Sequence, residues 1–593
     1  MISDLLRTKN LDEILAAPEQ GHGPKLKRNL SVWALMALGI GAIIGAGIFS
    51  TVGTAAAGGA DHLGAGPAII FSFVLTAFCC GFSGLCYAEL SAMVPISGSA
   101  YTYSYATLGE LVAWIIGWDL IIEYAVGNIA VAISWSGYFQ ELLRGFGINW
   151  PIWLGIDWRT ASQAAVSIAE VQARHGDILG ELGPSTVRMA SALDVAPHFG
   201  SVPILVNLPA FLIVMLITVI LVRGIKESAT FNNWMVGLKL AIIGFFAIFG
   251  TFYVKPENWT PFAPNGFKGI ASAAAIIFFA YIGFDAVSTA AEESRNPQRD
   301  MPRAILGSLA VCTVIYIVVA IVLTGLLPST QLGTAEPLAT AFSNLGMNWP
   351  ALVVSVGAVF ATTSVLLVFQ LGQPRIFFSM GRDGLLPSWA SKIHPKYQTP
   401  YVTTWITGWF VAVLAAFANL DEIVQLTNIG TLFAFALVCI GVIVLRRRDP
   451  DRERPFRVPL GDWLVPILGV ICCIFLMVYL PPASWWRFVG WLVLGAAIYS
   501  SFGWRHSTLG RRAGRPSENP GFMQVMAVGF LSAALGMFVI PHSAGIRELV
   551  HLATTPGVSE HLRSLVGGSA IVIGAALVVA GGVAGASRRR SAA

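Results

Sequence analysis

Charged residues are scarce in this chain. Of its 593 residues only 12% are Asp, Glu, Lys or Arg, whereas 55% are hydrophobic. A soluble domain carries roughly 25% charged residues, so the surface charge that a water-soluble fold needs is missing. The deficit excludes an ordinary soluble protein. The 61 Gly and 18 Trp residues fit a membrane protein, because close-packing glycines and interfacial aromatics are both common in membrane helices.

Signatures of catalysis and metal binding are also missing. All seven Cys fall inside apolar runs, which excludes a loop disulfide framework or a zinc site, and the nine His lie in tails and loops without metal-ligand spacing. The chain has no Walker loop, no Gly-x-Ser-x-Gly elbow and no His-Glu-x-x-His. The net charge of +5 comes from short loops rather than one basic face, which argues against nucleic acid. The sequence predicts no catalytic residues and no metal.

Apolar runs long enough to cross a bilayer recur along the chain. About 20 apolar residues cross the ~30 Å hydrocarbon core, and a window of that length predicts about fourteen transmembrane helices. They are expected near residues 32–55, 67–94, 110–140, 203–223, 229–254, 270–290, 304–327, 349–372, 401–419, 424–445, 463–480, 486–504, 521–540 and 567–586. The predicted fold class is an all-α polytopic membrane protein.

The spans divide the chain into three predicted parts. Residues 1–30 form an N-terminal tail without the apolar stretch of a signal peptide. Residues 31–446 hold spans 1–10, and residues 447–593 hold spans 11–14 and a C-terminal tail. The long segment 150–202 is expected to form a small structured cap outside the cell, with helical spacing over Ala164–Val171.

The basic residues predict the orientation of the spans. Most of the 37 Lys and Arg residues fall in the tails and in the loops on one side of the predicted membrane. An excess of Lys and Arg marks the cytoplasmic side, so both termini are expected in the cytoplasm.

Two spans carry glycine clusters at mid-depth. The first reads Gly39-Ile-Gly-Ala-Ile-Ile-Gly-Ala-Gly-Ile-Phe49, and the sixth contains Phe278-Phe-Ala-Tyr-Ile-Gly-Phe-Asp285. Each Gly disfavours a helix by ~1 kcal/mol relative to Ala, and unwound backbone in a membrane needs a protein or water-filled surrounding. Interrupted helices at corresponding positions of two halves point to the central site of a transporter, and spans 1 and 6 correspond in a repeat of five plus five. Helix packing through Gly-x-x-x-Gly pairs is the alternative.

Broken helices offer binding groups for both ends of an α-amino acid. The free N–H groups where a half-helix starts after span 1 breaks attract a carboxylate, and free carbonyls in span 6 accept an ammonium group. The predicted substrate-binding residues at the two breaks are Ile43, Ile44, Gly45, Ala46, Gly47, Ile48, Phe278, Phe279, Ala280, Tyr281, Ile282 and Gly283.

Charged and polar side chains inside spans add further candidates, because each charge costs at least ~2.5–3.5 kcal/mol at a helix centre. Lys239 in span 5 is predicted to carry the coupling proton, or else to pair with Glu123 of span 3 or with unwound carbonyls. Thr362 in span 8 either bonds back to its own helix or lines the pocket for the substrate side chain. Glu89 and Asp119 are expected to be satisfied packing residues or near-interface caps.

Several longer motifs resemble one known family. They are Gly39–Phe49, Tyr87–Glu89, Pro95–Tyr105, Gly117–Tyr124, Phe279–Asp285, Glu292–Pro297 and Arg375–Pro387. These motifs resemble the cationic amino acid transporter family of the amino acid–polyamine–organocation superfamily, and the likeness runs from about residue 20 to residue 510.

The resemblance implies a LeuT-type inverted repeat of spans 1–5 and 6–10, with alternating access around a site between broken spans 1 and 6. It implies proton coupling through Lys239, which falls where proton-coupled relatives carry a lysine. Glu123 matches a family glutamate and would bind a cationic side chain or pair with Lys239. The position of Thr362 varies among relatives, which leaves arginine and smaller neutral substrates both open.

The resulting expectation is a secondary transporter, symporter or exchanger, of cationic or small neutral L-amino acids in the cell membrane. It would be proton-coupled and sodium-independent, with the proton as coupling ion and no other cofactor. The expected partners are the amino acid and the lipid bilayer, and the expected state is a monomer or weak dimer; whether a small accessory membrane protein binds is left open. The rival interpretations are an amine or polyamine exchanger, a transporter-like nutrient sensor and a membrane enzyme.

Overall fold

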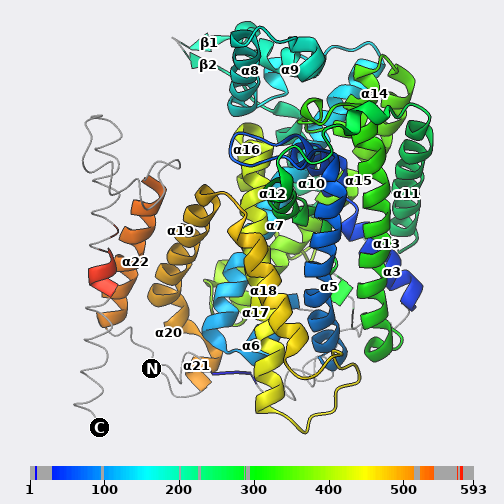
Figure 1. The fold of residues 1–593 in the computed structure, drawn as a ribbon. Helices are drawn as coiled ribbons and strands as arrows, with labels where there is room; N and C mark the ends of the chain where they lie inside the picture. The colour runs from blue at the N-terminus through cyan, green and yellow to red at the C-terminus, as the bar shows by residue number, and fades with distance from the viewer. Residues whose placement is uncertain are drawn as a thin grey trace.

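The computed structural model is a helical protein, and its described part contains one small two-stranded sheet (Figure 1). The residues that the structure describes are 7–9, 30–94, 99–199, 202–224, 229–285, 287–288, 291, 294–512, 521–539, 571 and 574–578. Most of the predicted N-terminal tail, part of the Pro95–Tyr105 motif, Glu292 and Glu293, and most of the fourteenth predicted span lie outside these residues.

The helices follow one another in three groups. The first group holds α3 (Val32–Ile43), η1 (Gly47–Thr51), α4 (Val52–Ala57), η2 (Gly66–Ala68), α5 (Ile69–Met93), α6 (Ser99–Thr107), α7 (Glu110–Gly145), α10 (Leu208–Arg223) and α11 (Ala229–Thr251). The second holds α12 (Gly266–Ile277), η5 (Phe278–Tyr281), α13 (Pro297–Leu326), α14 (Pro337–Asn344), α15 (Asn348–Arg382), α16 (Tyr401–Phe417) and α17 (Leu420–Arg448). The third holds α18 (Leu464–Val478), α19 (Pro482–Ile498), η9 (Tyr499–Gly503), α20 (Trp504–His506), α21 (Thr508–Arg512) and α22 (Gly521–Val539).

Many of these helices are suited to a membrane. Within the described part, six helices are long and apolar enough to cross a bilayer, and the number rises to eight if each of two bent pairs is one span. Four shorter apolar helices lie among them: Leu208–Arg223, Gly266–Tyr281, Tyr401–Phe417 and Met523–Ala534. The chain is therefore a multi-pass membrane protein, whereas the count of about fourteen spans and the LeuT-type repeat stay predictions.

The first span is bent where its glycines cluster. Ser31 caps the start of α3, since its Oγ accepts a hydrogen bond from the Ala34 N–H at 3.4 Å. The helix ends at Ile43, and the continuation from Gly47 runs at 42° to it. In the sixth span, α12 gives way at Phe278 to the single 3₁₀ turn η5. The two interruptions touch, because η1 contacts η5.

Helix α7 forms the centre of the bundle. Its apolar window is 89% buried, more than that of any other long span in the described part. It packs along α15 and also contacts α17, α10 and α16 (Figure 1). Because α7 is surrounded on several sides, its polar residues Asp119, Glu123 and Asn128 lie inside the protein.

The segment 150–202 forms a helical insertion at one end of the bundle, above α16 in Figure 1. It contains α8 (Trp158–Ala173) and α9 (Ile178–Val195), and the helix expected over Ala164–Val171 lies within α8. The strands β1 (His198–Phe199) and β2 (Val202–Pro203) pair antiparallel beside the helices. The insertion has its own small apolar core, built from Ile156, Ala161, Ala192, Ala196 and Leu205.

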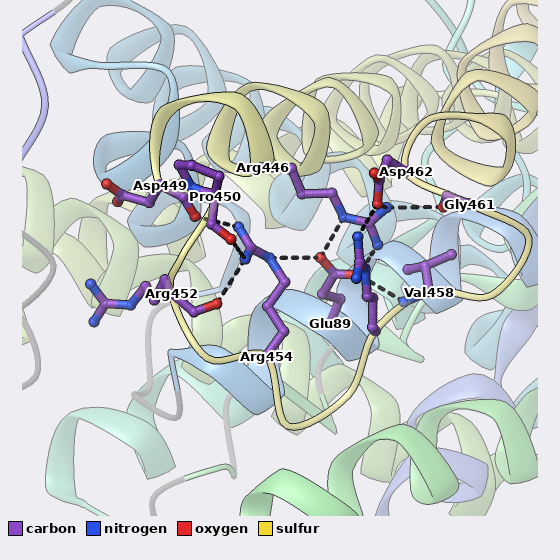
Figure 2. A network of polar contacts seen from close by, with 10 residues as sticks. Glu89, Arg446, Asp449, Pro450, Arg452, Arg454, Val458, Gly461 and Asp462 are labelled. Atoms are coloured by element: carbon purple, nitrogen blue, oxygen red, sulfur yellow. Dashed lines mark hydrogen bonds and ion pairs between the residues drawn. The ribbon is translucent and has the colours of Figure 1, made fainter.

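At the opposite end, a buried ion pair ties α5 to α17 (Figure 2). The Glu89 carboxylate is 2% exposed and accepts hydrogen bonds from Arg446 Nε at 2.9 Å, from Arg446 Nη2 and from the Val458 N–H at 2.8 Å. Arg454 Nε lies 3.7 Å from the same carboxylate. Glu89 therefore does more than cap its helix, because it holds the loop that follows α17 against α5.

Removing this carboxylate should destabilise the protein. Glu89→Ala removes the buried carboxylate partner of Arg446 and leaves it only the exposed Asp462 at 3.7 Å and the Gly461 carbonyl at 3.1 Å among the described residues. Breaking a buried ion pair on one side costs about 3–5 kcal/mol. Thermal unfolding of the purified protein in detergent should therefore show a clearly lower midpoint.

Asp462→Ala is the control from the same network, because the Asp462 carboxylate is 60% exposed, pairs with Arg457 at the surface and lies 3.7 Å from Arg446 Nη1. The hydrogen bond and charge of Arg457 lower the pKa of Asp462, yet exposed pairs contribute little to stability. The control should unfold like the wild type. Equal midpoints for Glu89→Ala and the wild type would contradict the structural role given to Glu89.

Candidate functional site

The two helix breaks lie against each other because glycine occupies the contact points. A Cβ atom added to Gly47 would overlap the backbone of Ala280. Gly283 has a φ of +120° and approaches span 1 so closely that a Cβ there would lie 2.8 Å from the carbonyl of Ala42. Only glycine adopts such a φ without strain. The glycines predicted at both breaks thus allow the two backbones to meet.

Two polar side chains from other spans satisfy carbonyl groups at the breaks. Tyr316 of α13 is fully buried, and its hydroxyl lies 3.0 Å from the Ile43 carbonyl and 2.8 Å from the Ala280 carbonyl. The Asn428 amide of α17 donates to the carbonyls of Ala275 at 2.7 Å and Ile276 at 2.8 Å. Sequence reasoning missed both residues, and only their polarity within apolar spans could have drawn attention to them.

The N–H groups that follow the break in span 1 start a new helical segment. The Ile44 N–H still donates to the Ile40 carbonyl at 2.9 Å, and the Phe49 N–H donates to the Gly45 carbonyl at 3.2 Å. The first N–H groups of a helix lack partners within it and carry a positive partial charge. We therefore expect the amides around Gly45–Gly47 to favour an anion, and every predicted residue of both breaks is buried.

A small cavity of about 30 Å³ lies beside the breaks. Its lining residues are Ala42, Glu123, Tyr124, Ile282, Gly283, Asp285, Val365, Val368 and Phe369. The cavity brings Glu123 together with Ile282 and Gly283, three of the predicted residues. A water needs about 10–15 Å³ of such space, so the cavity has room for a water or two and not for an amino acid.

Lys239 contacts the broken span directly. Its Nζ donates a hydrogen bond to the Gly41 carbonyl at 2.8 Å, in the last turn of α3, and the side chain is 1% exposed. Within the described part of the chain, no carboxylate forms an ion pair with Lys239. The sequence suggests two structural partners for Lys239. The contact with a backbone carbonyl is present, and the ion pair with Glu123 is not.

Thr362 and Tyr281 point away from the small cavity. The Thr362 hydroxyl bonds back to the Ala358 carbonyl of its own helix at 2.7 Å, and the Tyr281 hydroxyl donates to the Phe73 carbonyl of α5 at 3.1 Å. Val365, one turn beyond Thr362, lines the cavity and would touch a Cβ on Gly45 at 3.0 Å. An apolar residue in an apolar span gives no signal by which the sequence could have singled it out.

Asp119 departs from the expectation of a satisfied packing residue. It lies one helical turn before Glu123 on α7 and is fully buried. Neither of its carboxylate oxygens has a hydrogen-bond partner among the described residues, and the same holds for Oε2 of Glu123. Helix α7 therefore presents buried carboxylate oxygens without a hydrogen-bond partner in the described part of the chain.

Toward the end of the bundle that carries the insertion, hydrogen bonds connect span 1 to its neighbours. The Ser50 hydroxyl bonds to the Ser134 hydroxyl of α7 and to the Ala335 carbonyl in the segment before α14. One turn further along α7, the Tyr138 hydroxyl donates to the Phe49 carbonyl at 2.5 Å. These contacts join span 1, α7 and the outer segment into one closed layer, called the outer gate below.

Substitution of Gly283 should expose how tightly the breaks fit. Gly283→Ala combines an unfavourable φ with a contact of 2.8 Å to Ala42, and backbone strain of this kind costs about 1–3 kcal/mol. Gly346→Ala is the control, since Gly346 has a φ of +75° and open space around it. Thermal unfolding should show a larger loss for Gly283→Ala, and equal losses would contradict the close approach.

Comparison with known proteins places the chain in a family. The family model described as amino acid permease matches residues 30–498. The chain is 45% identical over 511 residues to the branched-chain amino acid permease BcaP of Bacillus subtilis (strain 168), which covers 86% of this chain and 100% of that protein. It is 44% identical over 510 residues to the methylthioribose transporter of the same organism, with the same coverage.

A plant protein is also similar to this chain. Cationic amino acid transporter 2, vacuolar, of Arabidopsis thaliana is 36% identical over 458 residues, which is 76% of this chain and 64% of the relative. These relatives are transporters and permeases, so the chain is not an enzyme. With a matching family model over most of its length and multi-pass helices built around two breaks, the chain belongs to the amino acid permease family of the amino acid–polyamine–organocation superfamily.

Proposed function

We propose that the protein is a secondary active transporter that moves L-amino acids across the cell membrane, coupled to protons and independent of sodium. The observation that carries the proposal is the hydrogen bond from buried Lys239 to the Gly41 carbonyl, 2.8 Å long, at the break of span 1. A buried lysine is costly in a membrane. Its charge here acts on the same backbone that would bind the substrate.

The amino acid head group is assigned to the two breaks. The carboxylate binds the N–H groups around Gly45–Ile48, where the helix dipole favours a negative charge. The ammonium group binds carbonyls at the end of span 6, around Phe278–Ile282. Neither interaction needs a charged side chain, so the site selects for the zwitterion and leaves the substrate side chain to other residues.

Lys239 links the proton to the shape of span 1. We assign the ammonium form to the state in which Lys239 Nζ holds the last turn of α3 through the Gly41 carbonyl, and we assign this state to a closed site. The neutral amine has a weaker hold on the carbonyl, so that span 1 is released to move. Binding and loss of one proton thereby favour different positions of the broken span, which is what proton-coupled alternating access requires.

The substrate side chain is assigned to the small cavity beside the breaks. Val365, Val368 and Phe369 offer apolar contact, whereas Glu123 and Asp285 offer negative charge. Small neutral and cationic amino acids both suit such walls. The relatives named for branched-chain and for cationic amino acids support the same two classes.

The topology follows from the loops. We place both termini in the cytoplasm of the cell, because the ends of α17 and α21 carry Arg446, Arg447, Arg448, Arg511 and Arg512. The insertion with α8 and α9 lies at the opposite end (Figure 1) and therefore faces outward. The structure then has its outer gate closed.

Lys239→Ala should uncouple transport from protons. Uptake of labelled L-leucine, L-alanine and L-arginine into proteoliposomes without sodium should rise several-fold with an inward proton gradient in the wild type. In Lys239→Ala this stimulation should vanish, while binding of the amino acid persists.

Lys255→Ala is the control, because Lys255 is exposed and lies outside the predicted spans. It should respond to the gradient like the wild type. Gradient-driven uptake that survives in Lys239→Ala would refute the coupling role of Lys239.

Glu123→Gln tests which class of amino acid side chain the transporter binds. If Glu123 binds a cationic side chain, the variant loses L-arginine uptake roughly tenfold or more, as for loss of a charge-assisted hydrogen bond, and keeps L-leucine uptake. Unlabelled methylthioribose serves as a competitor without an amino acid head group. Competition by methylthioribose at equal potency, or equal losses for arginine and leucine, would contradict the assignment.

A further inference from the structure

A second and larger cavity lies at the outer end of the bundle. It has a volume of about 130 Å³ and separates the insertion from the core helices. Its walls include Glu141 of α7, Ser185 and Arg188 of α9, Glu336 before α14, and Asp421 at the start of α17. We call this space the outer cavity.

The floor of the outer cavity is the outer gate. Ala335 lines the cavity, and its carbonyl accepts the hydrogen bond from Ser50 that joins span 1 to the segment before α14. Thr54, one turn beyond Ser50, also lines the cavity. A molecule in the outer cavity therefore rests on the layer that has to open before the helix breaks become accessible from outside.

The insertion covers the outer cavity and is held in place by hydrogen bonds to neighbouring segments. The Gln331 amide donates to the Gly180 carbonyl at 2.8 Å, and the Thr330 hydroxyl donates to the Glu181 carbonyl at 2.7 Å. On the other side, the Asn419 amide donates to the Thr160 hydroxyl at 2.9 Å. The insertion is thus fastened to the segment before α14 and to the start of α17, and it encloses the cavity between these anchors.

The outer cavity presents charges of both signs. Glu141 is paired with Arg144 at one wall. Burial and the nearby charge of Glu141 raise the pKa of Glu336 to about 8, although Arg144 acts in the opposite direction. Arg188 contributes a guanidinium from the opposite wall, and Asp421 contributes a carboxylate. Such walls suit a zwitterion better than a simple anion or cation.

Two lining oxygens have no partner in the described part of the protein. They are the Ser185 hydroxyl and Oδ1 of Asp421, both shielded from solvent. The other Asp421 oxygen lies 3.7 Å from His62 Nε2. Buried polar atoms are almost always hydrogen-bonded, so these oxygens require a bound molecule or water in the cavity.

The size of the outer cavity limits its occupant. A cavity of roughly 150 Å³ holds a molecule of the size of benzene, and the outer cavity has about 130 Å³. A small amino acid is of comparable size. The small cavity beside the breaks, at about 30 Å³, cannot hold one in this closed state.

We propose that the outer cavity is a second binding site, in which an amino acid zwitterion from outside waits above the closed gate. Arg188 binds the carboxylate and Asp421 binds the ammonium group, with Ser185 and Glu336 as additional hydrogen-bond partners. The inference rests on the proposed function, because it assigns the same class of substrate to a second place on its route. Opening of the gate then passes the bound molecule inward to the breaks.

Equilibrium binding of labelled L-leucine, L-alanine and L-arginine to the full chain in lipid nanodiscs tests the site. The wild type should bind two molecules of the transported amino acid per chain. Arg188→Gln should bind one, and its KM for uptake should rise roughly tenfold or more, as for loss of a charge-assisted hydrogen bond, with kcat unchanged. Arg174→Gln is the matched control, since Arg174 pairs with Glu181 on the exposed surface of the same insertion, and it should behave like the wild type.

Ser185→Leu provides a second variant that fills the cavity. The Ser185 hydroxyl has no partner to lose among the described residues, so the variant should unfold at the wild-type temperature and bind one molecule per chain. Val187→Leu, at an exposed position two residues further on, should bind two.

The outcomes separate this inference from the proposed function. Uptake of a probe together with one bound molecule per wild-type chain would overturn the outer site alone and would mean that the cavity holds only water. Two bound molecules in both folded variants would overturn it as well. Absence of binding and of uptake for all three amino acids would overturn the proposed function and the outer site with it.

Discussion

Unwound backbone inside an apolar protein needs hydrogen-bond partners, and the core of this structure is arranged around that need. The breaks in spans 1 and 6 free carbonyl and N–H groups where water is scarce, and each unsatisfied group would cost several kcal/mol. Tyr316, Asn428 and Lys239 reach these carbonyls from three different helices. The breaks therefore persist because their surroundings supply hydrogen-bond partners to these carbonyls.

Close packing sets the second constraint on the site. The breaks can touch only because Gly47 and Gly283 have no side chains at the points of contact. The same contact explains why the small cavity is too small for a substrate in this state. The proposed binding of an amino acid at the breaks therefore requires span 1 or span 6 to move, and glycines lower the cost of unwinding a helix there.

Both ends of the bundle carry ion pairs, but the contacts that hold span 1 against α7 are hydrogen bonds between neutral groups. At the end with α6, a buried carboxylate between two arginines fixes α5, α17 and the following loop (Figure 2). At the other end, neutral hydroxyl contacts of Ser50, Ser134 and Tyr138 close the gate. A buried ion pair is strongly destabilised when one partner leaves, whereas a hydroxyl bond contributes about 0.5–1.5 kcal/mol. The outer contacts are thus the easier ones to open, and they lie directly beneath the charged outer cavity.

The sequence by itself determined the membrane class, the permease family and the places where two spans break, because apolar length and glycine clusters are local properties of the chain. It also singled out Lys239 and Glu123, since a charge in an apolar span stands out wherever it lies. Only the tertiary structure decided what these groups touch. It joined Lys239 to Gly41 rather than to Glu123, turned Thr362 back onto its own helix, and brought Val365, Tyr316 and Asn428 to the breaks. It also placed the helices of the insertion over the outer gate. Contacts between distant segments depend on how the helices pack, so the sequence of either segment alone does not predict them.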